Sequence, residues 1–152
     1  MSHKTARVLV ALAIVLSLGG CASLQRSRDE GSAATVARLL AEGKGGELAK
    51  MSVSPFILDA EIIPLAADVA TFWDGAAKAG LRLDAGLARA VPVGPDTWRE
   101  FGASREVQVY FTKYATEGAR LFELRTPRGG RVLLLVRESF CTFSIYGFRG
   151  PF

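Results

Sequence analysis

The sequence predicts an α+β fold in which an antiparallel sheet of four or more strands packs, in two layers, against one main amphipathic helix. Apolar residues recur at helical spacing over residues 65–79, and short alternating or wholly apolar runs separated by turn residues dominate the last third of the chain. The chain has 152 residues, 49% of them hydrophobic and 22% charged. That composition is too apolar for a disordered chain, and the length suits one domain of ordinary size.

The first predicted strand covers residues 56–63, where side chains alternate between two faces and the run is bounded by Pro55 and Pro64. After Pro64 the period changes to that of a helix of about four turns, which ends at Gly80. Its apolar stripe contains Leu65, Val69, Phe72, Trp73 and Ala76. We expect the Phe72–Trp73 pair to be a main anchor of the core.

The remaining elements are mostly strands. Residues 87–93 favour a strand interrupted by Pro92, and a turn at 94–96 leads into a short helical stretch carrying Trp98 and Phe101. Four further runs have strand patterns: 106–114, 119–126, 131–138 and 140–147. A Pro-Arg-Gly-Gly turn joins the second of these runs to the third. Because the connections are short, consecutive strands should be antiparallel neighbours.

Residues 1–20 have the three parts of a secretory signal. Lys4 and Arg7 make the start basic, with no acidic residue, and the apolar run from Val8 to Leu18 follows. That run has eleven residues, too few for a helix to cross a hydrocarbon core of ~30 Å. Small residues then precede a cysteine, which predicts cleavage and export.

The run Leu18-Gly19-Gly20-Cys21 resembles the lipobox of bacterial lipoproteins. This resemblance implies that Cys21 becomes the first residue of the mature chain and carries a diacylglycerol and an acylated amine, as an anchor in the membrane. Ala22 follows in place of the aspartate that retains Gram-negative lipoproteins at the inner membrane. The implied location is therefore the periplasmic face of the outer membrane; an ordinary secretory signal and a Gram-positive host are the alternatives.

The mature chain is predicted to have two parts. Residues 21–53 would be the lipidated N-terminus, a flexible tether over Ala22–Ala34, and a short peripheral helix. The apolar residues of that helix are Val36, Leu39 and Leu40. Residues 54–152 would form the compact α+β domain.

Composition excludes several kinds of chemistry. His3 is the only histidine and leaves with the signal, which excludes Ser-His-Asp and Cys-His catalysis and zinc sites that need imidazole. We therefore expect no enzyme activity, no cofactor and no metal. Loss of Lys4 and Arg7 leaves 17 basic residues against 15 acidic ones, too mild a balance for a nucleic-acid partner. Cys141 would be the sole free thiol, buried in a strand or, alternatively, paired between molecules.

Two sets of charged residues are candidate sites. Arg120, Arg125, Arg128 and Arg131 lie around one predicted hairpin, where guanidinium groups would bind the phosphate or carboxylate of a ligand; the alternative is a solvated turn region. Asp59 and Glu61 would share one strand face ~7 Å apart, a separation that suits paired-carboxylate glycoside hydrolysis. The competing interpretation of this pair is the charged solvent face of an edge strand.

The C-terminal strand is rich in aromatic residues. Alternation predicts Phe140, Tyr146 and Phe148 on one face, and Phe143 with Ile145 on the other. If one face is exposed, it would contact a partner or lipid; core on both sides is the alternative.

Together these observations favour a lipid-anchored, non-catalytic binding or structural module of the cell envelope, whose partner is an envelope protein, the cell wall or lipid. One alternative is a carrier or sensor of a small apolar or anionic ligand, held in a cavity lined by Phe72, Trp73 and strand residues. Another is a glycan hydrolase that uses Asp59 and Glu61.

Overall fold

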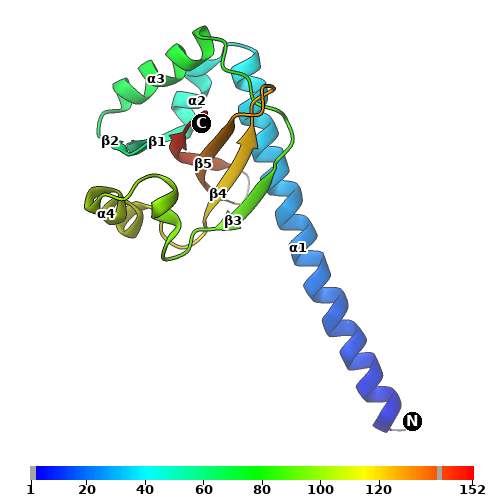
Figure 1. Cartoon of the computed structure of the whole chain (residues 1–152). Helices are drawn as coiled ribbons and strands as arrows, with labels where there is room; N and C mark the ends of the chain where they lie inside the picture. Colours follow the sequence, from blue (N-terminus) through cyan, green and yellow to red (C-terminus); the bar gives the residue numbers. More distant parts are fainter. Residues whose placement is uncertain (1–2, 140–141) are drawn as a thin grey trace.

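The computed structural model describes residues 3–139 and 142–152, with side chains described from Ala22 onward. The predicted α+β class is confirmed: helices pack on one six-stranded sheet (Figure 1). The elements are α1 (His3–Ala41), α2 (Gly45–Met51), β1 (Ser52–Leu58), β2 (Glu61–Ile63), α3 (Ala66–Lys78), β3 (Arg89–Pro92), the 3-10 helix η1 (Thr97–Glu100), α4 (Arg105–Tyr114), β4 (Ala119–Arg125), β5 (Arg131–Glu138) and β6 (Phe143–Arg149).

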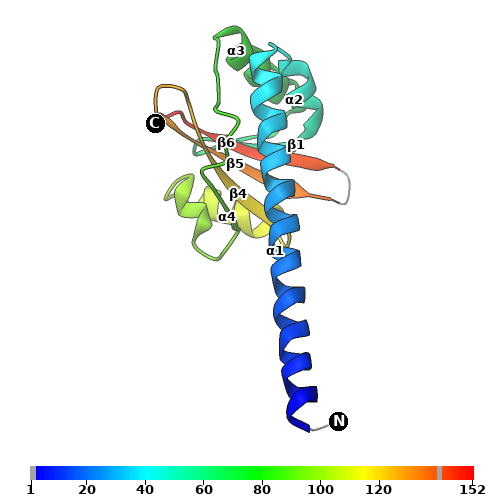
Figure 2. The ribbon, with the colours of Figure 1, turned by 90° about the vertical axis from the view of Figure 1, so that its right-hand side faces the viewer.

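The sheet has the strand order β2-β1-β6-β5-β4-β3, and all its neighbours are antiparallel except β1 and β6. Strand β5 lies inside the sheet, and the side chains of residues 132–136 are fully buried. Alternation sends Val132, Leu134 and Val136 into one core and Leu133 and Leu135 into the other. Helices therefore cover both faces, with α1, α2 and α3 on the first and α4 and η1 on the second (Figures 1 and 2).

The first core is built around the predicted aromatic anchor on α3. Trp73 is fully buried, and its ring packs edge-on against Phe56 at 6.2 Å and Phe148 at 5.5 Å between centroids. Its Nε1 donates a hydrogen bond to Ser52 Oγ at 2.8 Å, which satisfies the one polar atom of the indole. The helix predicted over 65–79 and its role as a core anchor are thus confirmed.

The strand predicted at 106–114 is wrong, because these residues form α4. The alternation that suggests a strand connects Val107, Val109 and Phe111. Val107, Tyr110 and Phe111 instead have helical spacing, and all three are buried in the second core. Ser104 favours the helix over the strand, because its Oγ accepts a hydrogen bond from the Val107 N–H at 3.2 Å and caps the helix N-terminus. Val109, the alternate apolar position, is 53% exposed.

The flexible tether expected over Ala22–Ala34, and the peripheral place of the helix after it, are also wrong. Helix α1 continues without a break to Ala41, and Ala33, Val36 and Leu40 are fully buried in the first core. The compact fold therefore includes residues well before 54. The N-terminal half of α1 extends beyond the rest of the molecule (Figures 1 and 2). Among the described residues, no helix is both long and apolar enough to span a membrane.

The last strand, β6, begins at Phe143, and its two faces differ from the predicted ones. A β-bulge where β6 pairs with Leu135 and Val136 shifts the alternation, so that Ile145 and Phe148 both enter the first core and Tyr146 packs against the second. Phe140 and Cys141, with the predictions made for them, lie outside the described residues.

Candidate functional site

The four candidate arginines do not form one cluster. Arg120 is the second residue of β4 and lies on the face covered by α1. Arg125 ends β4 and Arg131 begins β5, and both project from the other face. Arg128 lies in the turn between these strands. The sequence places them around one hairpin, but strand alternation and the length of β4 separate them.

Arg125 and Arg131 are occupied by internal ion pairs. The side chain of Glu123, only 12% exposed, accepts from Arg125 Nη2 at 2.9 Å and Arg131 Nε at 3.1 Å. Arg131 also pairs with Glu100 on η1 at 3.1 Å, and Arg89 reaches both glutamates. Burial acts against the charge of Arg131, but its hydrogen bonds to the two glutamates outweigh burial and raise its pKa. This network of three arginines and two glutamates links β3, β4 and β5, and its ion pairs engage both Arg125 and Arg131 within the fold.

Arg120 belongs to a part-buried polar seam between α1 and the sheet, made by Gln25, Asp29, Ser32, Arg120 and Glu138. Arg120 Nη2 donates to Asp29 Oδ2 at 2.6 Å, and the two side chains are 18% and 3% exposed. Gln25 Nε2 donates to Asp29 Oδ1 at 3.0 Å and to Glu138 Oε2 at 2.8 Å. Arg120 Nε is buried without a partner in the described part of the chain. The seam holds α1 on the sheet.

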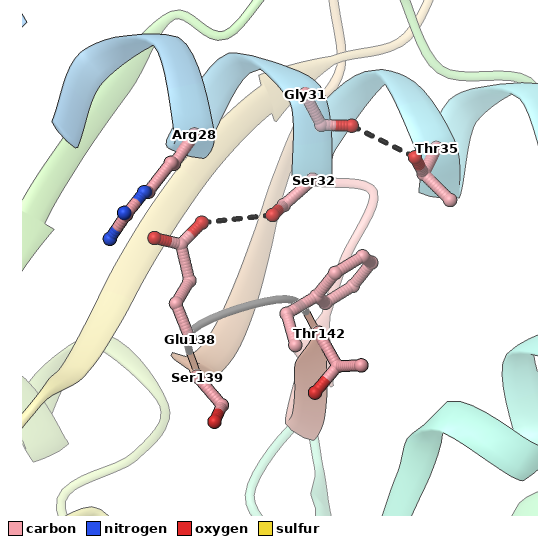
Figure 3. A pocket seen from close by; sticks show the side chains of 8 residues that line it. Arg28, Gly31, Ser32, Thr35, Glu138, Ser139 and Thr142 are labelled. Carbon is pink, nitrogen blue, oxygen red and sulfur yellow. Dashed lines mark hydrogen bonds between the residues drawn. The ribbon is translucent and has the colours of Figure 1, made fainter. Parts of the chain in front are cut away.

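A small polar pocket of about 300 Å³ adjoins the seam, between α1 and the end of β5 (Figure 3). Figure 3 shows Glu138 extending to Ser32, whose Oγ donates to Glu138 Oε1 at 2.8 Å. Because the second oxygen accepts from Gln25, both oxygens of this carboxylate are engaged. Arg28 lines the same pocket and forms no ion pair with any described residue. The pocket is small, and its one acid already has its partners.

The strongest candidate site is a larger groove of about 700 Å³ at the end of α3, which we call the α3 groove. It is lined by Phe72, Ala76, Ala79, Gly80, Leu81, Arg82, Thr126, Pro127, Arg128, Phe148, Gly150 and Pro151. Phe72 and Phe148 form a tilted ring pair with 5.2 Å between centroids, so the lining includes an aromatic pair continuous with the core. Of the two residues expected to line a ligand cavity, Phe72 does so and Trp73 is buried behind it.

The walls of the α3 groove are held by hydrogen bonds. In the turn, Thr126 N donates to Gly130 O at 2.8 Å, and Gly130 N donates to Thr126 Oγ1 at 2.9 Å. The C-terminal segment is fixed by a reciprocal pair between Arg131 and Phe152, at 2.9 and 3.1 Å. Gly150 turns the chain there with φ +103°, where an added Cβ would lie 2.6 Å from Arg131 O. The groove is therefore preformed.

The charged groups of the α3 groove are both cationic. Arg82 Nη1 donates to Leu40 O at 3.2 Å and Leu81 O at 3.0 Å, which leaves three of the five guanidinium N–H groups available. Arg128 makes no ion pair or side-chain hydrogen bond to the described residues and is exposed. None of the lining residues is acidic. Two guanidinium groups on an apolar groove suit a ligand with an apolar body and an anionic group.

The carboxylate pair proposed for hydrolysis loses its geometric basis. Residues 56–63 form a hairpin rather than one strand: Asp59 sits in its turn with φ +52°, and Glu61 is exposed on β2 opposite Leu58. Asp59 Oδ1 accepts a hydrogen bond from the Gly150 N–H at 3.0 Å, which suits a structural role. The two residues therefore do not share a strand face.

Neither a protein family, nor a curated protein, nor a solved structure matches this chain. Among the described side chains there is also no group of three or more histidine, cysteine or acidic residues placed to hold a metal ion.

Sequence reasoning missed Arg82, Asp29 and Glu100. Arg82 follows the glycine that ends α3, and a basic residue near helix ends is a known signal, but the helix end that it caps belongs to α1. Asp29 and Glu100 have partners 91 and 31 residues away. No local pattern indicates such pairs.

Proposed function

We propose that this protein is a lipid-anchored, non-catalytic binding module of the cell envelope, held at the periplasmic face of the outer membrane by Cys21. In this proposal the α3 groove binds a small ligand with an apolar body and an anionic group. The observation that carries the ligand class is the groove lining, which combines an aromatic pair with two arginines and contains no acidic residue.

The anchor is supported by the run Leu18-Gly19-Gly20-Cys21 behind a basic start and an apolar segment. Two or three acyl chains hold a protein durably on a membrane, at ~0.8 kcal/mol per buried methylene. The intact mass of the membrane-extracted protein should correspond to loss of residues 1–20 with a diacylglycerol and an acyl chain added. Cys21→Ala should stay unprocessed, and a mature wild-type chain without lipid would contradict the anchor.

A binding role is favoured over catalysis because the predicted mature chain contains no histidine, and because the best-placed carboxylates are engaged. Glu123 and Glu138 each accept two or more hydrogen bonds or ion pairs from side chains of the fold. Because side chains of the fold already engage the oxygens of these two carboxylates, neither is placed to exchange a proton with a substrate.

The ligand class can be tested with 1-anilinonaphthalene-8-sulfonate, a fluorescent probe with an apolar ring system and a sulfonate. The soluble chain from residue 22 should bind it, and decanoate should compete. Removal of a charge-assisted hydrogen bond of about 1.5 kcal/mol predicts that Arg128→Ala weakens binding about tenfold, with Arg128→Lys in between.

The matched control is Arg26→Ala, which removes an arginine with an 81% exposed side chain on α1, away from the groove. It should leave probe affinity unchanged. Leu81→Asp adds a carboxylate to the lining and should abolish binding of the sulfonate. Equal affinity in wild type, Arg128→Ala and Leu81→Asp would overturn the groove as the binding site.

A further inference from the structure

Helix α1 leaves the sheet at its β3 edge. Ala22, Gln25, Arg26, Asp29 and Glu30 line a groove of about 440 Å³ whose other wall is residues 87–90 and Arg120. The opposite half of α1 enters the first core through Val36 and Leu40. Figure 2 shows α1 running across the strands, passing β6, β5 and then β4 toward its N-terminus. Cys21 therefore lies one residue before Ala22, the first of the α1 residues that line this groove at the β3 edge.

The link between Cys21 and the folded domain is short and helical. Gln25 is four residues from Cys21, about 6 Å along a helix, and Asp29 is about 12 Å away. Both side chains are fixed in the polar seam by hydrogen bonds to Glu138 and Arg120. The thirteen-residue tether expected from the sequence would instead reach about 40 Å when extended.

We propose that the folded domain sits directly on the bilayer that holds Cys21, with its β3 edge toward the lipid headgroups and its β2 edge away from them. This inference rests on the lipid anchor of the proposed function. The partner surface is the headgroup layer, because the helix that carries the anchor is continuous with the docked part of α1. Because the link between Cys21 and the fold is short and rigid, the sheet edge nearest to Cys21 must lie against the membrane.

The side chains around this exit suit an interfacial position. Leu24 is 65% exposed, and Arg28 forms no ion pair within the described chain. The other charges of this stretch are internally paired, Arg26 with Glu30 and Asp29 with Arg120. An exposed leucine and an unpaired arginine favour the boundary between headgroups and acyl chains. Pro92 at the end of β3 also limits pairing of this edge with another strand.

The test compares the two outer edges of the sheet in the full, acylated protein. A fluorophore is attached at Ala88→Cys, beside Ala22 in the same groove, or at Glu61→Cys on β2, each with Cys141→Ser. Five strand spacings separate the two edges, about 24 Å. The protein is placed in phosphatidylcholine–phosphatidylglycerol vesicles that contain a lipid with a nitroxide on its headgroup.

We expect the label at Ala88→Cys to be quenched at least threefold more than the label at Glu61→Cys. A flexible Gly-Ser insert of about twelve residues between Ala22 and Ser23 has a mean span of roughly 20 Å and should remove the difference. Circular dichroism of each variant verifies that the fold is kept.

Flotation of the vesicles separates the two proposals. If the protein fails to float with the lipid, the lipid anchor is wrong, and so is the placement of the domain on the bilayer. If the protein floats and both edges are quenched equally, the anchor stands and the direct seating is overturned. If the insert leaves the asymmetry unchanged, the rigid link is not its cause, which also overturns the inference.

Discussion

Replacing Asp29 with asparagine tests whether residues 22–32 of α1 are docked on the sheet. The Asp29 side chain is 3% exposed and its Oδ2 accepts from Arg120 Nη2 at 2.6 Å. Asparagine keeps the size of the side chain and an oxygen for the hydrogen bond from Gln25, but removes the charge. The guanidinium of Arg120 would then be buried without a counter-ion.

Removing one partner of a buried ion pair costs about 3–5 kcal/mol. The lower end applies here, because the Arg120 side chain is 18% exposed and its Nε already lacks a partner among the described residues. We therefore expect Asp29→Asn to lower the free energy of unfolding by about 3 kcal/mol. With a urea m-value of about 1.5–2 kcal/mol/M, the midpoint should fall by about 1.5–2 M.

The assay is urea unfolding of the soluble chain from residue 22, followed by circular dichroism. Adding Arg120→Met to Asp29→Asn removes both charges and should recover most of the loss, which gives a coupling energy of about 1–3 kcal/mol. Glu30→Gln is the control, since its pair with Arg26 is exposed and should change stability by less than about 0.5 kcal/mol. If Asp29→Asn behaves like this control, residues 22–32 do not dock, and the tether expected from the sequence is restored.

Three further predictions concern the core. Trp73→Ala should lower the free energy of unfolding by about 3–5 kcal/mol in urea, and a loss under 1 kcal/mol would place the indole outside the core. Gly147→Ala should lower the free energy of unfolding by about 3 kcal/mol or more, because its Cβ would collide with Ile57 Cγ2 and lie 2.9 Å from Ile57 O. Gly75→Ala on α3, where a Cβ meets nothing within 4 Å, is the matched control and should stabilise the chain by about 0.5–1 kcal/mol; equal effects at both sites would refute the contact. Burial, with smaller contributions from Tyr146 and Tyr114, raises the pKa of the Tyr110 hydroxyl well above its usual range. The unfolded chain releases this proton near pH 10 and the folded chain keeps it, so stability should be complete below pH 10 and fall by up to about 1.4 kcal/mol per pH unit above it. Chemical unfolding between pH 9 and 11.5 should show a shallower fall for Tyr110→Phe, and identical slopes would contradict the assignment.

The sequence by itself determined the elements whose signals are local. The helical spacing up to Gly80 predicts α3, and the Pro-Arg-Gly-Gly turn between two apolar runs predicts the β4–β5 hairpin with β5 at its observed bounds. Helical spacing followed by Gly80 marks α3, and an apolar run on each side of a proline- and glycine-containing turn marks the hairpin, so no distant contact is needed. The lipobox-like run is equally local, and its anchor remains a prediction.

Tertiary structure decided what depends on partners far along the chain. Residues 106–114 satisfy both periods, and the capping of Val107 by Ser104, together with burial of one helical face, selects α4. Residues 22–32 of α1 contain too few apolar residues to predict docking on the sheet. Their docking depends on pairs such as Asp29 with Arg120, 91 positions later. The α3 groove likewise exists only where α3, the β4–β5 turn and the C-terminal segment meet. Periodicity is a property of neighbours in sequence, whereas ion pairs and grooves are properties of neighbours in space.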